Sequence, residues 1–276
     1  MDSLPLRHVS LGFNLPPVCR LGLATRGDTH LSSDDIHHAI ESGINYLNWC
    51  GHPDAMSHAV RELGPKRKDV VIAVQLSAVA GDEMKHELDV CLKELRTDWI
   101  DVPTFYWMES AEQWTEITGK DGAFSALNSA REHGRVRMIG VTSHQRKLAA
   151  SLAESGAVDL LMIRYNAAHS GAERDIFPVT APHKLPVVAY TCLRWGALLR
   201  STPEDPSGFE IPPAPMWYRW ALQNPNVSVT IMAPDNRAEL EDDLTLLQDW
   251  RALSDDEMKA LSEHGRRVYR HAGNFP

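Results

Sequence analysis

Short apolar, β-branched runs alternate along this chain with longer stretches in which apolar residues recur every three or four positions. The short runs are almost continuously apolar, which is typical of parallel strands covered on both faces. The longer stretches, such as SSDDIHHAIESG and RKLAASLAESG, have the spacing of amphipathic helices. The pattern predicts eight strands, over 18–25, 44–49, 70–76, 99–107, 136–143, 158–166, 186–192 and 227–233.

Residues that start and stop helices fall between these strands. Ser32 or Ser33 suits an N-cap, and Gly43, Gly134 and Gly156 stand where helices should end. Eight strand–helix units in 276 residues predict an α/β fold, a single (β/α)8 TIM-type barrel domain over 1–276. An open doubly wound sheet is the alternative, but no GxGxxG follows the first strand.

Two segments lie outside the repeating pattern. HVSLGFNLPP, before the barrel, predicts a small N-terminal β-hairpin with its turn near Asn14. Residues 201–215 contain too many prolines and turn formers for a helix. We therefore expect a long loop on the catalytic face after strand seven.

Composition narrows the class of protein. A hydrophobic content of 43% and a charged content of 24% allow a sizeable core. The net charge of −9, with scattered Lys and Arg, argues against a nucleic-acid partner. No apolar run is long enough to span a membrane and the start lacks a signal-peptide pattern, so we expect a cytoplasmic protein with a small-molecule substrate. The four cysteines lie far apart and indicate neither disulfides nor structural zinc.

Several segments, in order and over nearly the whole chain, resemble the aldo-keto reductase superfamily. They include GINYLNW, GRVRMIGVTSH, RYNAAHSGAERDIFP, VVAYTCLRWGALL and NVSVTIMAPDNRAEL. The resemblance implies a barrel whose N-terminal mouth is covered by the hairpin. It also implies a nicotinamide cofactor, NADP or NAD, across the C-terminal mouth, and oxidoreduction of a small polar carbonyl or alcohol.

The resemblance also implies a catalytic Asp, Tyr, Lys and His, and this chain departs from all four. Asn48 replaces the Asp, Gln75 replaces the Lys, and Tyr106 replaces the His. The Tyr is missing from a shortened segment that offers His52 and Pro53. Because two neutral amides that can hydrogen-bond one another replace both charges, we interpret the change as a coordinated rebuild. A pseudoenzyme with a relaxed site is the alternative.

Two residues are candidates for the missing acid. Tyr106, at the end of strand four, could donate a proton to a substrate oxygen, or it could simply pack on Trp107 and Trp49. These two tryptophans are the aromatic candidates for contacting the substrate. His52 is the other acid or base, since its pKa can be near neutrality. A Cys50–His52 nucleophile pair is disfavoured because only one residue separates them.

Two arginines near strand ends need an explanation. Arg194 follows strand seven beside the long loop, and we interpret it as a clamp for a substrate carboxylate or phosphate. Arg164 lies within strand six, where a structural ion pair with Asp101, Glu173 or Asp159 is the favoured interpretation.

No metal site is expected. His and Cys side chains follow several predicted strands on one face, but none has short-range ligand spacing. The residues concerned are Cys50, His52, His144, His169 and Cys192.

Part of the family's cofactor pattern is present. By resemblance, Tyr190 stacks on the nicotinamide, Thr142 and Ser143 hold its carboxamide, and Asn166 also matches. Met162 replaces a Gln that would bind the same carboxamide.

The phosphate end of the cofactor pattern is weaker. Asn236 matches the start of the last helix, which can receive a phosphate. Asp235 would repel the 2′-phosphate of NADP, and only Arg237 could compensate. We expect nicotinamide binding to be weakened, without preference for NADP or NAD, and absent in the extreme case.

Three functions remain open. The first is an NAD(P)-linked oxidoreductase with a rebuilt site that includes Asn48 and Gln75. The second is a barrel enzyme without redox chemistry, such as a lyase or isomerase. The third is an inactive protein that binds a ligand.

Overall fold

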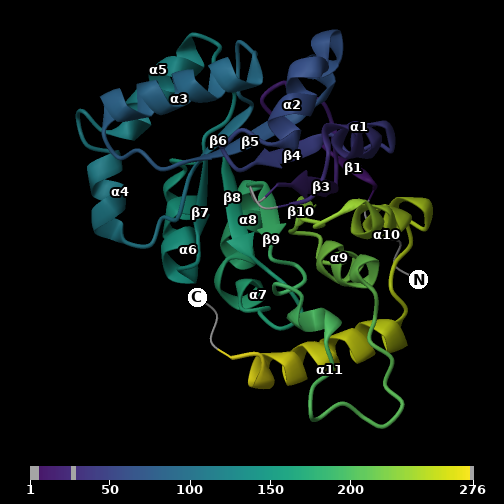
Figure 1. Ribbon diagram of the computed structural model, residues 1–276. Helices are drawn as coiled ribbons and strands as arrows, with labels where there is room; N and C mark the ends of the chain where they lie inside the picture. Colours follow the sequence, from purple (N-terminus) through teal and green to yellow (C-terminus); the bar gives the residue numbers. More distant parts are fainter. Residues whose placement is uncertain (1–5, 26–28, 274–276) are drawn as a thin grey trace.

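A closed barrel of eight parallel strands forms the centre of the protein (Figure 1). The computed structural model describes residues 6–25 and 29–273. The barrel strands are β3 (Leu21–Ala24), β4 (Tyr46–Trp49), β5 (Val71–Leu76), β6 (Val102–Phe105), β7 (Gly140–Ser143), β8 (Leu160–Arg164), β9 (Val187–Tyr190) and β10 (Val229–Met232). They pair in chain order, and β10 closes on β3. The predicted (β/α)8 barrel is confirmed, with all eight strands inside the predicted ranges.

Helices surround the barrel and connect its strands (Figure 1). The connecting helices are α1 (Ser33–Glu41), α2 (Ala55–Glu62), α3 (Gly81–Leu95), α5 (Ala123–Glu132), α6 (Arg146–Ser155), α8 (Phe177–His183), α9 (Ala214–Leu222) and α10 (Arg237–Gln248). The additional helical segments are η1 (Gly64–Asp69), α4 (Ala111–Ile117), α7 (Ala172–Asp175), η2 (Ala197–Leu199) and the C-terminal α11 (Asp255–His271). Within the described ranges, no helix is both long enough and apolar enough to cross a membrane.

The N-terminal hairpin exists, but its second strand is not where the sequence predicted it. β1 (His8–Val9) pairs antiparallel with β2 (Val18–Cys19), whose residues were expected in the first barrel strand. The turn includes Asn14, whose φ is 57°. Arg20 separates β2 from β3, and its guanidinium donates to the carbonyls of Val227 and Ser228. The single apolar run over 18–25 therefore serves two sheets.

The barrel interior is filled by one of two hydrophobic clusters. Tyr46, Val71, Val102 and Leu160 belong to it, and Leu11 of the hairpin turn packs against them. The second cluster lies between the strands and the helix layer. This division follows the strand period of two, so alternate residues of each strand point inward.

The predicted helix ends are confirmed where the structure gives their geometry. The Ser32 hydroxyl accepts from the Asp35 amide, and the Asp35 carboxylate accepts from the Ser32 amide, which makes a capping box. Gly156 ends α6 with φ 67°, a conformation that glycine adopts without steric cost.

The connection after η2 is long and irregular, as predicted, and it is pinned to α11. Asp205 accepts from the Thr202 amide at 2.6 Å and from Arg267 at 2.6 Å, and it lies 2.9 Å from Nδ1 of the buried His264. Burial alone would raise the pKa of Asp205, but these hydrogen bonds lower it to about 2. The loop ends earlier than predicted, because Ala214 already begins α9; a proline is tolerated in the first turn of a helix.

Helix α11 runs below α7 in Figure 1 and contacts the connections that follow β8 and β9. A Cβ on Gly265 would come within 2.4 Å of the Ala167 carbonyl oxygen, so glycine permits this close approach. Beyond the helix, the Gly273 carbonyl accepts from Arg194 at 2.8 Å. The C-terminal segment therefore borders the barrel mouth.

Candidate active site

Six side chains surround the carboxyl end of the barrel. Five of them lie at or next to the end of a strand, and the strand period places them on its inner face, while Tyr106 directly follows the last residue of β6. The ring consists of Asn48, Gln75, Tyr106, Thr142, Arg164 and Tyr190. The carboxyl face is where barrel enzymes build their active sites.

The two amides of this ring do not form the expected pair. Asn48 is 4% exposed, and its Oδ1 has no hydrogen-bond partner in the part of the chain that the structure describes. Gln75 is half-buried on the neighbouring strand β5. A buried amide oxygen without a partner is unfavourable, so Asn48 is suited to accept a hydrogen bond from a ligand.

Trp49 does not face the mouth, which corrects its prediction as a substrate residue. It is fully buried in the cluster between barrel and helices, and its Nε1 donates to the His52 carbonyl and to Asp54. Asn48 and Trp49 are neighbours on β4 and must point to opposite faces. The indole bonds hold the loop that carries His52.

Cys50 and His52 do not form a nucleophile–base pair in the structure. Cys50 Sγ lies 3.5 Å from Asp54 Oδ2, and burial raises the pKa of its thiol. A raised pKa disfavours the thiolate that nucleophilic catalysis needs. The His52 side chain is exposed on the loop after β4.

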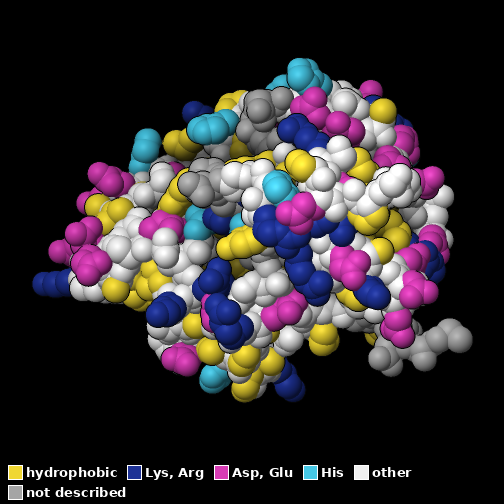
Figure 2. All heavy atoms as spheres, turned by 90° about the horizontal axis from the view of Figure 1, so that it is seen from below, with side chains coloured by type: hydrophobic (Ala, Val, Ile, Leu, Met, Phe, Trp, Pro, Cys, Tyr) yellow, Lys and Arg dark blue, Asp and Glu magenta, His cyan; other side chains and the backbone are white. Residues whose placement is uncertain are grey.

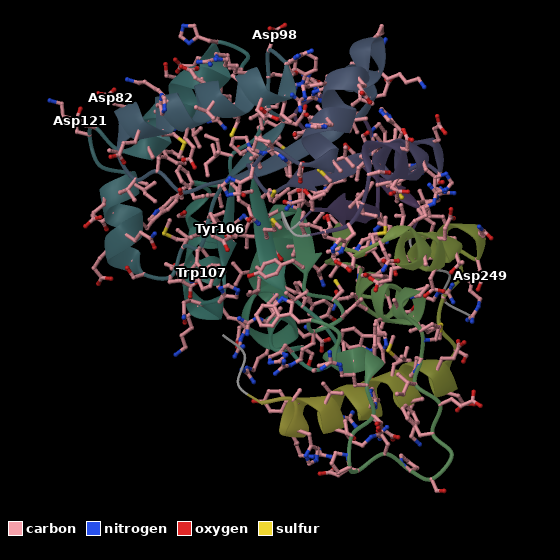
Figure 3. The ribbon with its side chains drawn as sticks, in the orientation of Figure 1. Asp82, Asp98, Tyr106, Trp107, Asp121 and Asp249 are labelled. Atoms are coloured by element: carbon pink, nitrogen blue, oxygen red, sulfur yellow. The ribbon has the colours of Figure 1, made fainter. Side chains whose placement is uncertain are left out.

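An aromatic row crosses the mouth from β6 to β9. The Tyr106 and Trp107 rings are 5.7 Å apart, edge to face, and Figure 3 shows them next to one another. The His144 ring lies 4.9 Å from Trp107 and 5.7 Å from Tyr190. Tyr106 is 42% exposed and Trp107 is 45% exposed. Both are accessible to a ligand, unlike Trp49.

Glu109 holds His144 in this row. Its Oε1 accepts from the His144 amide at 2.9 Å and lies 3.2 Å from the ring Nδ1. Burial and the nearby Arg164 lower the pKa of His144, while Glu109 acts in the opposite direction. From the sequence, His144 was considered only as a metal ligand and Glu109 was not singled out.

Arg164 points into the mouth, so the favoured structural ion pair is wrong for each acid that was proposed. Asp101 contacts Arg67 and Arg137, Asp159 pairs with Arg131, and Glu173 accepts from the Tyr165 hydroxyl. Arg164 instead borders a cavity at the mouth.

The Arg194 side chain is buried at the edge of the site. It is 4% exposed, has φ 49°, and donates to the Gly273 carbonyl. Together with Arg164 and Arg146 it lowers the pKa of His169 to about 4, although burial of that imidazole is the larger cause. The three arginines therefore act on one region of the mouth.

The side chains considered as metal ligands do not come together. Within residues 6–25 and 29–273, no three His, Cys, Asp or Glu side chains are grouped so that they could hold a metal ion. Cys192 is buried beneath the mouth, and burial raises its pKa to about 12.

Of the residues expected to hold a nicotinamide, Tyr190 has a ring at the mouth, whereas the polar side chains bond within the protein. Tyr190 presents a half-buried ring at the end of β9, and its buried hydroxyl has no hydrogen-bond partner among the described residues. Thr142 Oγ1 accepts from the Trp107 amide, and Ser143 Oγ accepts from the Gln145 amide. Asn166 donates to the Thr191 carbonyl and accepts from two amides of its own loop. These polar groups are already used within the protein.

At the other end of the predicted cofactor site, acids surround Arg237. Asn236 caps α10 by accepting from the Glu239 amide. Arg237 pairs with Asp35 at 3.0 Å and with Glu241 at 2.7 Å. A phosphate at this helix start would have to compete with these carboxylates.

The closed barrel and the N-terminal hairpin agree with the fold that the resemblance implies. The sequence model of the aldo/keto reductase family matches residues 21–211. This chain belongs to the aldo/keto reductase family. Two relatives named aldo-keto reductase, from Mycolicibacterium paratuberculosis and Mycobacterium avium, are each 27% identical over 236 residues. The alignment covers 78% of this chain and 75% of each relative.

Solved structures of aldo-keto reductases share the fold of this chain. The holo form of an enzyme from Bacillus halodurans superposes with a TM-score of 0.75 and 16% identity, covering 94% of this chain and 96% of that one. An aldo/keto reductase from Klebsiella pneumoniae, in complex with NADP and acetate, gives a TM-score of 0.72 and 19% identity, with 91% and 92% covered. At these identities the likeness concerns the fold.

Arg146 was not identified from the sequence. It begins α6 and borders the same cavity as Arg164. A signal was present in the sequence. The helix after strand five starts with Arg146 and Lys147, whereas acidic residues are favoured in a first turn.

Proposed function

We propose that this aldo/keto reductase is an NAD(P)-linked oxidoreductase of a small polar carbonyl or alcohol, with a relocated proton donor. The observation that carries the proposal is the mouth ring. It combines an open tyrosine, Tyr106, with a half-buried stacking ring, Tyr190, on a family barrel. The NADP in the Klebsiella relative supports the choice of cofactor.

Tyr190 would stack on the nicotinamide, and the start of α10 at Asn236 and Arg237 would receive a phosphate. When bound, the cofactor supplies or accepts a hydride. Thr142, Ser143 and Asn166 use their polar groups for bonds within the protein. Stacking on Tyr190 would therefore orient the nicotinamide more than hydrogen bonds to its carboxamide would. We expect the cofactor to bind more weakly than it would if these side chains also bonded its carboxamide.

Tyr106 is the proposed acid because its side chain is exposed at the mouth, directly after β6. Its Oη would donate a proton to the carbonyl oxygen during reduction and take it back during alcohol oxidation. Asn48, whose buried Oδ1 has no partner within the described ranges, would accept a hydrogen bond from the substrate. Trp107 would contact the substrate beside Tyr106. His52 would serve instead if its loop closed over the mouth, and Gln75 would orient a polar group of the substrate.

Replacing the proposed acid tests its role. In Tyr106→Phe, NADPH oxidation with a panel of small aldehydes and ketones should fall about 100-fold in kcat, because general acids contribute about that much or more. NADPH affinity should stay within about twofold, since the ring remains. Absorbance of NADPH measures the rate, and fluorescence titration measures the affinity.

Tyr269→Phe is the matched control, since it removes a hydroxyl from an exposed tyrosine on α11. It should keep wild-type turnover. Equal turnover in wild type and Tyr106→Phe would show that the phenol is not the acid, and a loss in His52→Gln would then point to His52.

A barrel that binds a ligand without redox chemistry is the second candidate function. The internal use of Thr142, Ser143 and Asn166 favours it, because the family's carboxamide contacts are then unavailable. Under this alternative, NADPH would fail to bind while small polar ligands would still stabilise the protein.

A further inference from the structure

A small cavity at the mouth is bordered by two arginines and two histidines. It lies between the carboxyl ends of β7 and β8 and the start of α6, and it measures about 30 Å³. Since about 10–15 Å³ of such space holds one water, it accommodates about two oxygen-sized groups. Its lining residues are Ser143, His144, Arg146, Ile163, Arg164, His169 and Ile176.

The two cavity arginines come from different elements and are held differently. Arg164 ends β8 on the inner face of the barrel. The Arg146 guanidinium bonds Asp175 at 2.6 Å and lies against Gly171, where a Cβ would come within 2.8 Å of it. Asp175 is shared with Arg174, and Glu109 is bound to His144. Among the described residues, Asp175 thus divides its charge between two arginines, in a chain whose net charge is −9.

The start of α6 adds to the positive potential at this point. Its N-cap, Gln145, makes no side-chain cap, and its first turn contains Arg146 and Lys147 but no acid. Positive charge at the positive end of a helix is unfavourable. An anion in the adjoining cavity would offset that cost and would receive hydrogen bonds from the arginine forks.

From this arrangement, we infer that the cavity binds a carboxylate of the substrate, with Arg164 and Arg146 as its anchors. The space for about two oxygens favours a carboxylate over a larger phosphate. The inference rests on the proposed function for the identity of the reacting group: the substrate would be an oxo acid or hydroxy acid. Its carbonyl or alcohol would extend toward Tyr106 along the aromatic row. Figure 2 shows Lys and Arg side chains gathered toward the middle of the face seen from below.

The test measures anion binding without any cofactor. Calorimetric titration of wild-type protein with malonate should show saturable binding. Malonamide, the uncharged analogue, should bind at least tenfold more weakly, and inorganic phosphate should be weaker than malonate. Arg164→Gln should weaken malonate binding at least tenfold.

Two further variants keep the test decisive. Arg146→Gln changes a more exposed side chain and should also weaken malonate binding, even if Arg164→Gln folds poorly. Arg174→Gln removes a neighbouring charge that does not border the cavity, and it should bind malonate within about twofold of wild type.

Equal binding of malonate by wild type, Arg164→Gln and Arg146→Gln would overturn the inference, as would equal binding of malonate and malonamide. Tighter binding of phosphate than of malonate would mean that the cavity binds a phosphate group of the substrate and not a carboxylate. Because no nicotinamide is present, malonate binding without NADPH binding would refute only the proposed redox function. NADPH turnover without malonate binding would refute only the carboxylate site.

Discussion

Asp243→Asn should make the protein more stable, and the gain should grow as the pH rises. Asp243 of α10 is 3% exposed, and it accepts from the Tyr218 hydroxyl at 3.3 Å. Burial, with a smaller contribution from nearby acids, raises its pKa from 3.8 to about 8. The folded protein therefore keeps a proton that the unfolded chain releases, and stability is lost as the pH rises from about 4 to about 8.

The neutral amide in the Asp243→Asn variant would remove this dependence. One pKa unit corresponds to about 1.4 kcal/mol, so the stability gap between variant and wild type should widen by about 3 kcal/mol from pH 5 to pH 8. Urea denaturation across this pH range measures it. Asp121→Asn, at an exposed aspartate on the edge of the molecule in Figure 3, should leave the wild-type profile unchanged. A constant gap between Asp243→Asn and wild type would mean that Asp243 is ionised in the folded protein.

Asp101→Ala should destabilise the protein by about 4 kcal/mol, since it removes one partner of a buried ion pair. Asp101 is 1% exposed at the start of β6, and its Oδ2 accepts from Arg67 and from the Ile72 amide, both at 2.9 Å. Its Oδ1 accepts from Trp99 Nε1 at 3.0 Å. Removing the carboxylate would leave the buried Arg67 charge without this partner and would free a donor on β5.

Thermal and urea unfolding measure this loss, and Asp101→Asn should recover part of it because an amide oxygen still accepts. Asp98→Ala is the matched control: the residue lies three positions earlier on the same connection, and its side chain is exposed. A loss below about 1 kcal/mol in Asp101→Ala would contradict the role of this ion pair in holding the amino-terminal end of the barrel.

The barrel was predictable because each strand is a continuous apolar run and each helix keeps its own period. The boundary between β2 and β3 was not, since Arg20 is the only charged residue between Val18 and Ala24. The pairing of β2 with β1 shows that the two segments belong to different sheets. The early start of α9 was missed because prolines at 212, 213 and 215 suggested a loop, although a first turn accepts proline.

The site was less predictable because it combines residues at strand ends with residues of the loops that follow them. The strand period could have shown that Asn48 faces inward and Trp49 outward, and that Arg164 shares the face of Met162. Nothing local could show that Glu109 would hold His144, since they are 35 residues apart. That contact depends on how two loops meet at the mouth.

The most direct test of the central claim is a titration of the purified protein with NADPH, followed by tryptophan fluorescence. We predict saturable quenching with a Kd in the micromolar range, weakened at least tenfold in Tyr190→Ala, while Tyr269→Phe binds like wild type. No saturable change up to millimolar NADPH, in protein shown to be folded by circular dichroism, would contradict the claim that this aldo/keto reductase is an NAD(P)-linked oxidoreductase.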